Sequence, residues 1–138
     1  MTDQKIKAAK KILVVEDEEY IRDLYVQLLQ KEGYLVESAV DGEEAYMKMS
    51  KKDYDLILLD IILPKIDGLQ ILEKFKKEKK ELSSPVVLLT NLSQEVVVAK
   101  AVDYGVRGYM VKSDLTPYDI LREVDGYLNG KHVNTQLK

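Results

Sequence analysis

Four short apolar runs, each followed directly by a polar side chain, constrain the fold of this chain more than any other feature. The runs and the polar residues after them are 12–15 with Glu16 and Asp17, 56–59 with Asp60, 86–89 with Thr90, and 108–111 with Lys112. Uninterrupted apolar runs of this length are typical of strands buried on both faces of a parallel sheet. In an open parallel sheet the carboxyl ends of the strands converge on one crevice, where such folds bind ligands. The sequence therefore predicts one site that contains these five polar residues.

Amphipathic stretches separate the apolar runs. Ile21, Leu24, Tyr25 and Leu28 follow the spacing of one helix face. The most polar of the strand-like runs, 34–39, is expected at a sheet edge. Five strands alternate with five helices in this reading, which predicts an α/β fold: a doubly wound parallel sheet covered by helices on both faces.

Capping pairs mark the starts of later helices. Asp41 with Glu44 three residues later resembles a capping box, and Thr116 directly before Pro117 is a strong helix start. Ser93 is a further candidate N-cap. The helix after Ser93 is expected to bury Val98, Ala101 and Val102.

Size and composition limit the remaining possibilities. The chain has 138 residues, which fits one domain, expected over 11–130 between a polar extension, 1–10, and a short polar tail, 131–138. The net charge of −3 gives no general attraction to nucleic acid or to anionic membranes. There is no cysteine, and His132 is the one histidine, which disfavours thiolate or histidine metal sites. No run approaches the roughly 20 apolar residues of a membrane span, so a cytoplasmic protein is expected.

The predicted site has the chemistry of phosphoryl transfer. Three neighbouring carboxylates, on Glu16, Asp17 and Asp60, repel one another, and a hard cation such as Mg²⁺ relieves that repulsion while leaving room for a phosphoryl oxygen. Lys112 adds a positive charge and Thr90 a hydroxyl donor. Singly, each residue has a structural explanation; Asp17, for example, is also a candidate cap for a helix beginning at Glu18. Their coincidence on successive strands favours a site with Asp60 as nucleophile.

The residues resemble the response-regulator receiver domain of two-component signalling. The resemblance runs from about Lys11 to Gly130, and the motifs that carry it are Ile12–Glu18, Leu58–Gly68, Leu89–Thr90 and Gly108–Lys112. It implies a flavodoxin-like receiver fold with strand order 2-1-3-4-5. It also implies a signalling phosphoacceptor that catalyses only its own phosphorylation and slow dephosphorylation.

The resemblance assigns roles to the site residues. It implies that Asp60 is the phosphoacceptor and that Mg²⁺ is held by Asp17, Asp60 and the backbone carbonyl of Ile62, with Glu16 acting through water. Lys112 is implied to pair with the phosphoryl group. The implied donor is a sensor histidine kinase or a histidine phosphotransfer protein.

The resemblance further implies a switch and an output surface. Thr90 resembles the switch hydroxyl and Tyr109 the aromatic side chain that turns inward with it. The expected output surface consists of the last two helices and the strand between them, which control partner binding and possible homodimer formation. We expect a single-domain regulator without a DNA-binding output. Candidate surface residues are Val96, Val97, Tyr104, Tyr118 and Tyr127.

Three departures from the usual receiver pattern involve four positions. Ser113 replaces the proline that usually follows the lysine, and Asn91 replaces the small residue after the threonine. Ile62 and Leu92 are apolar where polar residues tend to speed hydrolysis. The apolar pair predicts a long-lived aspartyl phosphate.

Three alternatives compete with this interpretation. A flavodoxin-type FMN binder needs a phosphate loop after the first strand, where the acidic run 16–19 would repel phosphate. An aspartyl-nucleophile phosphatase usually carries a second acid two residues after the nucleophile, where this chain has Ile62. A receiver that serves only for docking loses the site, whereas this chain keeps all five site residues.

Overall fold

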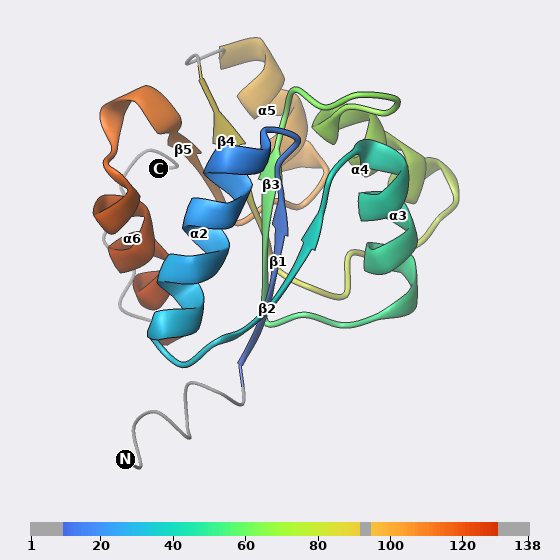
Figure 1. Ribbon diagram of the computed structural model, residues 1–138. Coiled ribbons are helices and arrows are strands. Elements are labelled where there is room, and N and C mark those ends of the chain that lie inside the picture. The colour runs from blue at the N-terminus through green and yellow to red at the C-terminus, as the bar shows by residue number, and fades with distance from the viewer. Residues whose placement is uncertain (1–9, 92–94, 130–138) are drawn as a thin grey trace.

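The computed structural model describes residues 10–91 and 95–129, and it contains one parallel five-stranded sheet (Figure 1). The strand order is β2-β1-β3-β4-β5, which confirms the predicted topology. The strands are β1 (Lys11–Val15), β2 (Leu35–Ala39), β3 (Leu56–Asp60), β4 (Val86–Thr90) and β5 (Gly108–Val111). The polar run expected at an edge is edge strand β2.

Helices cover both faces of the sheet, as predicted (Figure 1). One face packs against α2 (Glu19–Lys31) and α6 (Pro117–Asn129). The other face packs against α3 (Gly42–Lys51), α4 (Gly68–Lys77) and α5 (Glu95–Asp103). A short 3-10 turn, η1 (Lys112–Asp114), follows β5.

Alternating side chains of the central strands supply two separate apolar cores. In β1, Leu13 and Val15 face the core under α3, α4 and α5, whereas Ile12 and Val14 face the core under α2 and α6. All four side chains are fully buried. Burial on both faces explains why the strand sequence is apolar without alternation.

The predicted caps are present. The Asp41 carboxylate accepts a hydrogen bond from the Glu44 amide at 2.8 Å, and Thr116 Oγ1 accepts one from the Asp119 amide at 3.1 Å. Asp67 and Gln70 form a full capping box at the start of α4. The start of α2 differs: its N-cap is Glu18, not Asp17, and no side chain caps it.

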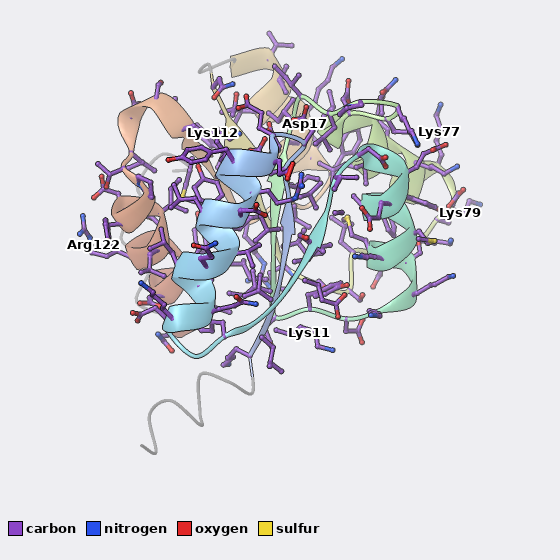
Figure 2. All side chains as sticks on the ribbon, in the orientation of Figure 1. Lys11, Asp17, Lys77, Lys79, Lys112 and Arg122 are labelled. Atoms are coloured by element: carbon purple, nitrogen blue, oxygen red, sulfur yellow. The ribbon has the colours of Figure 1, made fainter. Side chains whose placement is uncertain are left out.

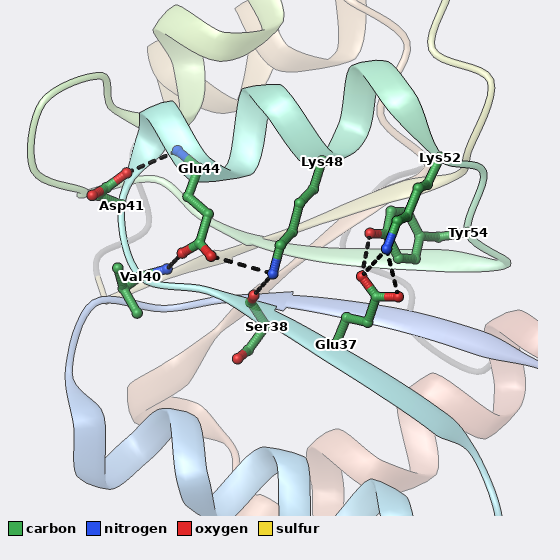
Figure 3. Close-up of polar contacts among 8 residues, drawn as sticks. All are labelled: Glu37, Ser38, Val40, Asp41, Glu44, Lys48, Lys52 and Tyr54. Atoms are coloured by element: carbon green, nitrogen blue, oxygen red, sulfur yellow. Dashed lines mark hydrogen bonds and ion pairs between the residues drawn. The ribbon is translucent and has the colours of Figure 1, made fainter.

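Side chains of α3 and its C-terminal flank satisfy the open edge of β2 (Figure 3). Lys48 Nζ donates to the Ser38 carbonyl at 2.6 Å, and the Val40 amide donates to Glu44 at 2.8 Å. These contacts occupy backbone groups of the edge region that would otherwise be available to another strand. A second group, in which Lys52 and Tyr54 both donate to Glu37, ties β2 to the segment before β3 (Figure 3).

The prediction for α5 was partly wrong. Ala101 is buried and Val98 is half-buried, but Val102 is 45% exposed. Of these three residues, Ala101 belongs to the core under α3, α4 and α5, whereas Val102 faces solvent. The proposed cap Ser93 lies outside the described residues. Within the described parts of the chain, no helix has the length and apolar character of a membrane span.

Candidate phosphoacceptor and metal site

Three carboxylates meet at the carboxyl ends of β1 and β3. One oxygen from each of Glu16, Asp17 and Asp60 lies within 4.8 Å of the others. Because β1 and β3 are hydrogen-bonded neighbours, the polar residues that follow them are forced together. Figure 2 shows Asp17 at the opposite end of the molecule from Lys11, which begins β1. The cluster predicted from the strand ends is therefore formed.

Lys112 bridges the two buried carboxylates of this cluster, those of Glu16 and Asp60. Its Nζ donates to Asp60 Oδ2 at 2.8 Å and also to Glu16 Oε1. Glu16 and Asp60 are buried, and Asp17 is exposed at the rim. A lysine between two buried carboxylates offsets part of their mutual repulsion.

Burial shifts the pKa values of Asp60 and Lys112. It raises the pKa of Asp60 to about 6, with the negative charge of Glu16 acting in the same direction and Lys112 opposing both. Burial alone would lower the pKa of Lys112, but its bonds to Asp60 and Glu16 outweigh that effect and raise it. A carboxylate that is costly to ionise beside a fixed ammonium group is typical of a functional site.

Backbone amides fix the buried carboxylates further. Glu16 Oε2 accepts from the Glu18 amide at 3.1 Å, and Asp60 Oδ1 accepts from the Ile62 amide at 3.2 Å. Gly68 permits the chain to pass close behind Asp60, because a Cβ at this position would lie 2.5 Å from the Asp60 carbonyl oxygen. The role predicted for the Ile62 carbonyl stays a prediction.

The sequence analysis missed Arg22. Its Nη1 donates to the Glu16 carbonyl at 3.0 Å and to the Asp17 carbonyl at 3.3 Å. An arginine in the second turn of a helix has no sequence signal that separates this contact from an ordinary solvated side chain.

The proposed switch residues lie on the adjacent strands. Thr90 is buried at the end of β4 and pairs in register with Val111 of β5. Tyr109 is half-buried and packs against the core under α3, α4 and α5. The two side chains thus flank the site from neighbouring strands, and their roles in switching stay predictions.

Ser113 and Asn91 contact each other at the rim of the site. The Lys112–Ser113 peptide bond is trans, and Ser113 Oγ donates to the Asn91 carbonyl at 3.4 Å. Ile62, two residues beyond Asp60, is 63% exposed. Leu92, the other apolar position linked to hydrolysis, lies outside the described residues.

The donor set suits a hard divalent cation. Mg²⁺ prefers carboxylate and carbonyl oxygens and usually takes one or two protein carboxylates, keeping several waters. Asp17 and Asp60 offer such oxygens, with Glu16 behind them and without nitrogen or sulfur competitors in the cluster. The residues therefore fit a hard, oxygen-preferring cation such as Mg²⁺ better than Zn²⁺ or Cu²⁺, which favour imidazole or thiolate ligands.

Two curated proteins that are similar to this chain are both transcriptional regulatory proteins. The chain is 36% identical over 124 residues to the alkaline phosphatase synthesis transcriptional regulatory protein PhoP of Bacillus subtilis, covering 90% of this chain and 50% of that protein. It is 34% identical over 118 residues to the transcriptional regulatory protein ResD of the same organism, covering 86% of this chain and 48% of that protein. The chain thus spans about half the length of these two relatives.

Solved structures agree with the fold. A CheY-like receiver domain protein from Methanospirillum hungatei matches with a TM-score of 0.76 at 29% identity, covering 88% of this chain and 95% of that one. The response regulator TrrA of Thermotoga maritima, in complex with Mg²⁺ and BeF, matches with a TM-score of 0.69 at 37% identity, covering 86% of this chain and 98% of that one. The family described as the response regulator receiver domain matches residues 12–124. On this match and these relatives, the chain belongs to the receiver-domain family of two-component response regulators.

Proposed function

We propose that this chain accepts a phosphoryl group on Asp60 from a phosphohistidine donor. The observation that carries the proposal is the Asp60 carboxylate itself, buried among two further acids with Lys112 Nζ at 2.8 Å. A carboxylate oxygen of Asp60 forms a bond to phosphorus while the bond between phosphorus and the donor imidazole nitrogen breaks. The electron pair of that bond stays on the nitrogen, so a donor ring that is protonated on its other nitrogen leaves as neutral imidazole.

The chain's own residues supply positioning and charge. Asp17, Asp60 and the Ile62 carbonyl would hold Mg²⁺, with Glu16 acting through water. When bound, Mg²⁺ neutralises charge on the phosphoryl oxygens. Lys112 pairs with the transferred group, and the Thr90 hydroxyl donates to one of its oxygens. The Mg²⁺ and BeF in the structure of the related TrrA support this assignment.

In this proposal another protein donates the phosphoryl group, and this chain acts only on its own Asp60. A sensor histidine kinase or a histidine phosphotransfer protein is the donor, and the chain accelerates only its own phosphorylation and slow dephosphorylation. The exposed apolar side chain of Ile62 beside Asp60 supports slow hydrolysis, because it offers no polar group to orient an attacking water. A long-lived aspartyl phosphate is the expected result.

The output is a shift between two arrangements of the Thr90 and Tyr109 region. Partners would bind one arrangement better, on a surface formed by α5, β5 and α6. The 71% exposed Val96 on α5 and the 65% exposed Tyr118 on α6 support a contact surface there, for another protein or for a second copy of the chain.

The output of the whole protein is a separate proposal. PhoP and ResD are named as transcriptional regulators and are about twice the length of the aligned region. A receiver domain over 11–130 with short polar flanks, acting in the cytoplasm through protein partners without nucleic acid, stays our prediction for this chain.

Mass spectrometry after incubation with acetyl phosphate and Mg²⁺ tests the phosphoacceptor. We expect one phosphoryl adduct on the peptide that contains Asp60, and its loss in EDTA and in Asp60→Asn. Asp55→Asn, which changes an exposed carboxylate near the opposite end of β3, is the matched control and should retain the adduct. An adduct on another residue, or none, would contradict the proposal.

A further inference from the structure

The three acids of the cluster are not held equally. The Glu16 and Asp60 carboxylates are fixed by Lys112 and by the backbone amides of Glu18 and Ile62. The Asp17 carboxylate is exposed, and within 10–91 and 95–129 no hydrogen bond or ion pair holds it. The position of this carboxylate therefore depends on the backbone that carries it.

That backbone segment is held by Arg22. The Arg22 guanidinium reaches back from the second turn of α2, and its Nη1 donates to the consecutive carbonyls of Glu16 and Asp17 at 3.0 and 3.3 Å. The Arg22 amide also closes the first helical turn on the Glu18 carbonyl at 2.8 Å. The same residue thus joins the helix to the loop through both its backbone and its side chain.

No cap at the start of α2 duplicates this contact. Glu18 occupies the N-cap position without a side-chain hydrogen bond, and the bond that its amide donates to Glu16 Oε2 holds the Glu16 side chain and not the Asp17 carbonyl. Hydrogen bonds from a charged guanidinium to carbonyls are stronger than those between neutral groups, and here one guanidinium nitrogen, Nη1, serves both carbonyls.

We propose that Arg22 is a positioning residue for the metal ligand Asp17, acting through its two hydrogen bonds to the Glu16 and Asp17 carbonyls. This inference rests on the proposed function, because it assumes that Asp17 binds Mg²⁺. The residue does not touch the metal or the phosphoryl group. It sets the direction in which the β1–α2 loop presents the Asp17 carboxylate.

A positioning role and a charge effect predict opposite changes in Mg²⁺ affinity when Arg22 is replaced by alanine. A guanidinium near a cation site repels the cation, so a role through charge alone means that Arg22→Ala tightens Mg²⁺ binding. A positioning role means that Arg22→Ala weakens it, since groups that orient metal ligands typically contribute ten- to a hundredfold in affinity. Arg22→Lys separates the two further, because it keeps the charge on a side chain that is one bond shorter than that of arginine.

Calorimetric Mg²⁺ titration of the full chain at constant ionic strength tests the proposal. We expect Arg22→Ala to weaken binding on the order of tenfold and Arg22→Lys to recover only part of that loss. Arg122→Ala is the control for losing an arginine, because Arg122 pairs with Asp119 on α6. Thr116→Ala is the control for lost stability away from the site. Both controls should bind Mg²⁺ as wild type does.

The outcomes separate the inference from the proposed function. Wild-type affinity or tighter binding in Arg22→Ala, or full affinity in Arg22→Lys, overturns the positioning role while the metal site stands. An equal loss in Arg22→Ala and Thr116→Ala assigns the effect to stability and also overturns it. If the wild-type chain binds no Mg²⁺, or if Asp17→Asn binds as tightly as wild type, the proposed metal site fails and the inference fails with it.

Discussion

The starts of the helices fall into two kinds. Helices α4 and α6 each begin with a reciprocal pair of side-chain caps, formed by Asp67 with Gln70 and by Thr116 with Asp119. Helix α3 begins with the Asp41 cap on the Glu44 amide, and the Glu44 side chain accepts from the Val40 amide. Helix α2 begins beside the acidic cluster and has no side-chain cap. The difference coincides with the site: at the start of α2 the Glu18 side chain makes no cap, and the Glu18 amide donates to Glu16 of the acidic cluster.

The contrast between the capped helix starts and the start of α2 shows which part of the fold is less stabilised. An N-cap side chain typically stabilises a helix by about 1 kcal/mol. The cluster acts in the opposite direction, because it buries Glu16 and Asp60 against their preference for water. Departures from local rules are expected at functional sites, and here the departure and the buried charge occur at the same strand end.

Removing Lys112 should cause the largest loss of stability. Lys112→Met leaves the buried carboxylates of Glu16 and Asp60 without their cation, and breaking a buried pair from one side costs about 3–5 kcal/mol. Urea unfolding in EDTA at neutral pH measures the loss, which should shrink on acidification as Asp60, with its raised pKa of about 6, protonates. Lys52→Met is the matched control, because it breaks only the exposed pair with Glu37 and should cost less than about 1 kcal/mol. Equal losses in the two variants would contradict the contrast.

Removing the Asp60 charge should increase the stability of the metal-free protein. The folded-state pKa of about 6 lies above the ordinary value of 3.8, so this group favours folding most below pH 4 and loses that contribution as pH rises through 6. The difference corresponds to at most on the order of 3 kcal/mol at neutral pH. Asp60→Asn should therefore exceed wild type in free energy of unfolding at pH 7.5 in EDTA.

The pH dependence of the difference in free energy of unfolding between Asp60→Asn and wild type is a more specific test than its value at pH 7.5. The gain of Asp60→Asn over wild type should grow between pH 4 and pH 6 and then level off. Asp55→Asn, at an exposed carboxylate whose Oδ2 accepts from the Lys11 amide at 2.7 Å, gives the pH course of an Asp→Asn change outside the cluster for comparison. A gain independent of pH would mean that burial does not raise the pKa of Asp60.

Much of this arrangement could be predicted from the sequence, because strong local signals and the global fold agree. The uninterrupted apolar run of β3 requires burial on both faces, and the polar residue after such a run must lie at the sheet end. Thr116 before Pro117 fixed the start of α6 for the same kind of reason: the cap satisfies amides that the helix leaves unpaired whatever surrounds it.

The remaining features depend on contacts between distant or variable positions. The contact of Arg22 with carbonyls five and six residues before it depends on the turn that the chain makes between β1 and α2, for which the sequence has no signal. Exposure of Val102 depends on how α5 rests on its core, which the spacing of three apolar residues does not determine. Which carbonyl beside Asp60 faces a cation depends on the path of the β3–α4 loop, for which the sequence has no periodic signal.

Removing a cap away from the site should cost stability without affecting metal binding. Thr116→Ala deletes the acceptor of the Asp119 amide and should lower the free energy of unfolding by about 1 kcal/mol. Mg²⁺ affinity should equal that of wild type, because α6 begins outside the acidic cluster. Thermal unfolding in EDTA and Mg²⁺ titration measure the two effects. Weaker Mg²⁺ binding in this variant would show that stability and the site are not separable in the way the contrast requires.

Supplying the missing cap should have the smallest effect and is the most direct test of the contrast. Glu18 has the extended backbone of an N-cap, with φ of −75° and ψ of 114°, so the shorter side chain of Glu18→Asp can reach the amides of the first turn while keeping its charge. We expect a gain of about 0.5 kcal/mol in EDTA and unchanged Mg²⁺ affinity. Glu19→Asp, one position inside the helix, is the matched control and should give no gain. A gain in stability together with weaker Mg²⁺ binding would mean that the start of α2 lacks a cap because the β1–α2 loop must stay free to present Asp17. A loss of stability would mean that the Glu18 carboxylate already stabilises this helix start.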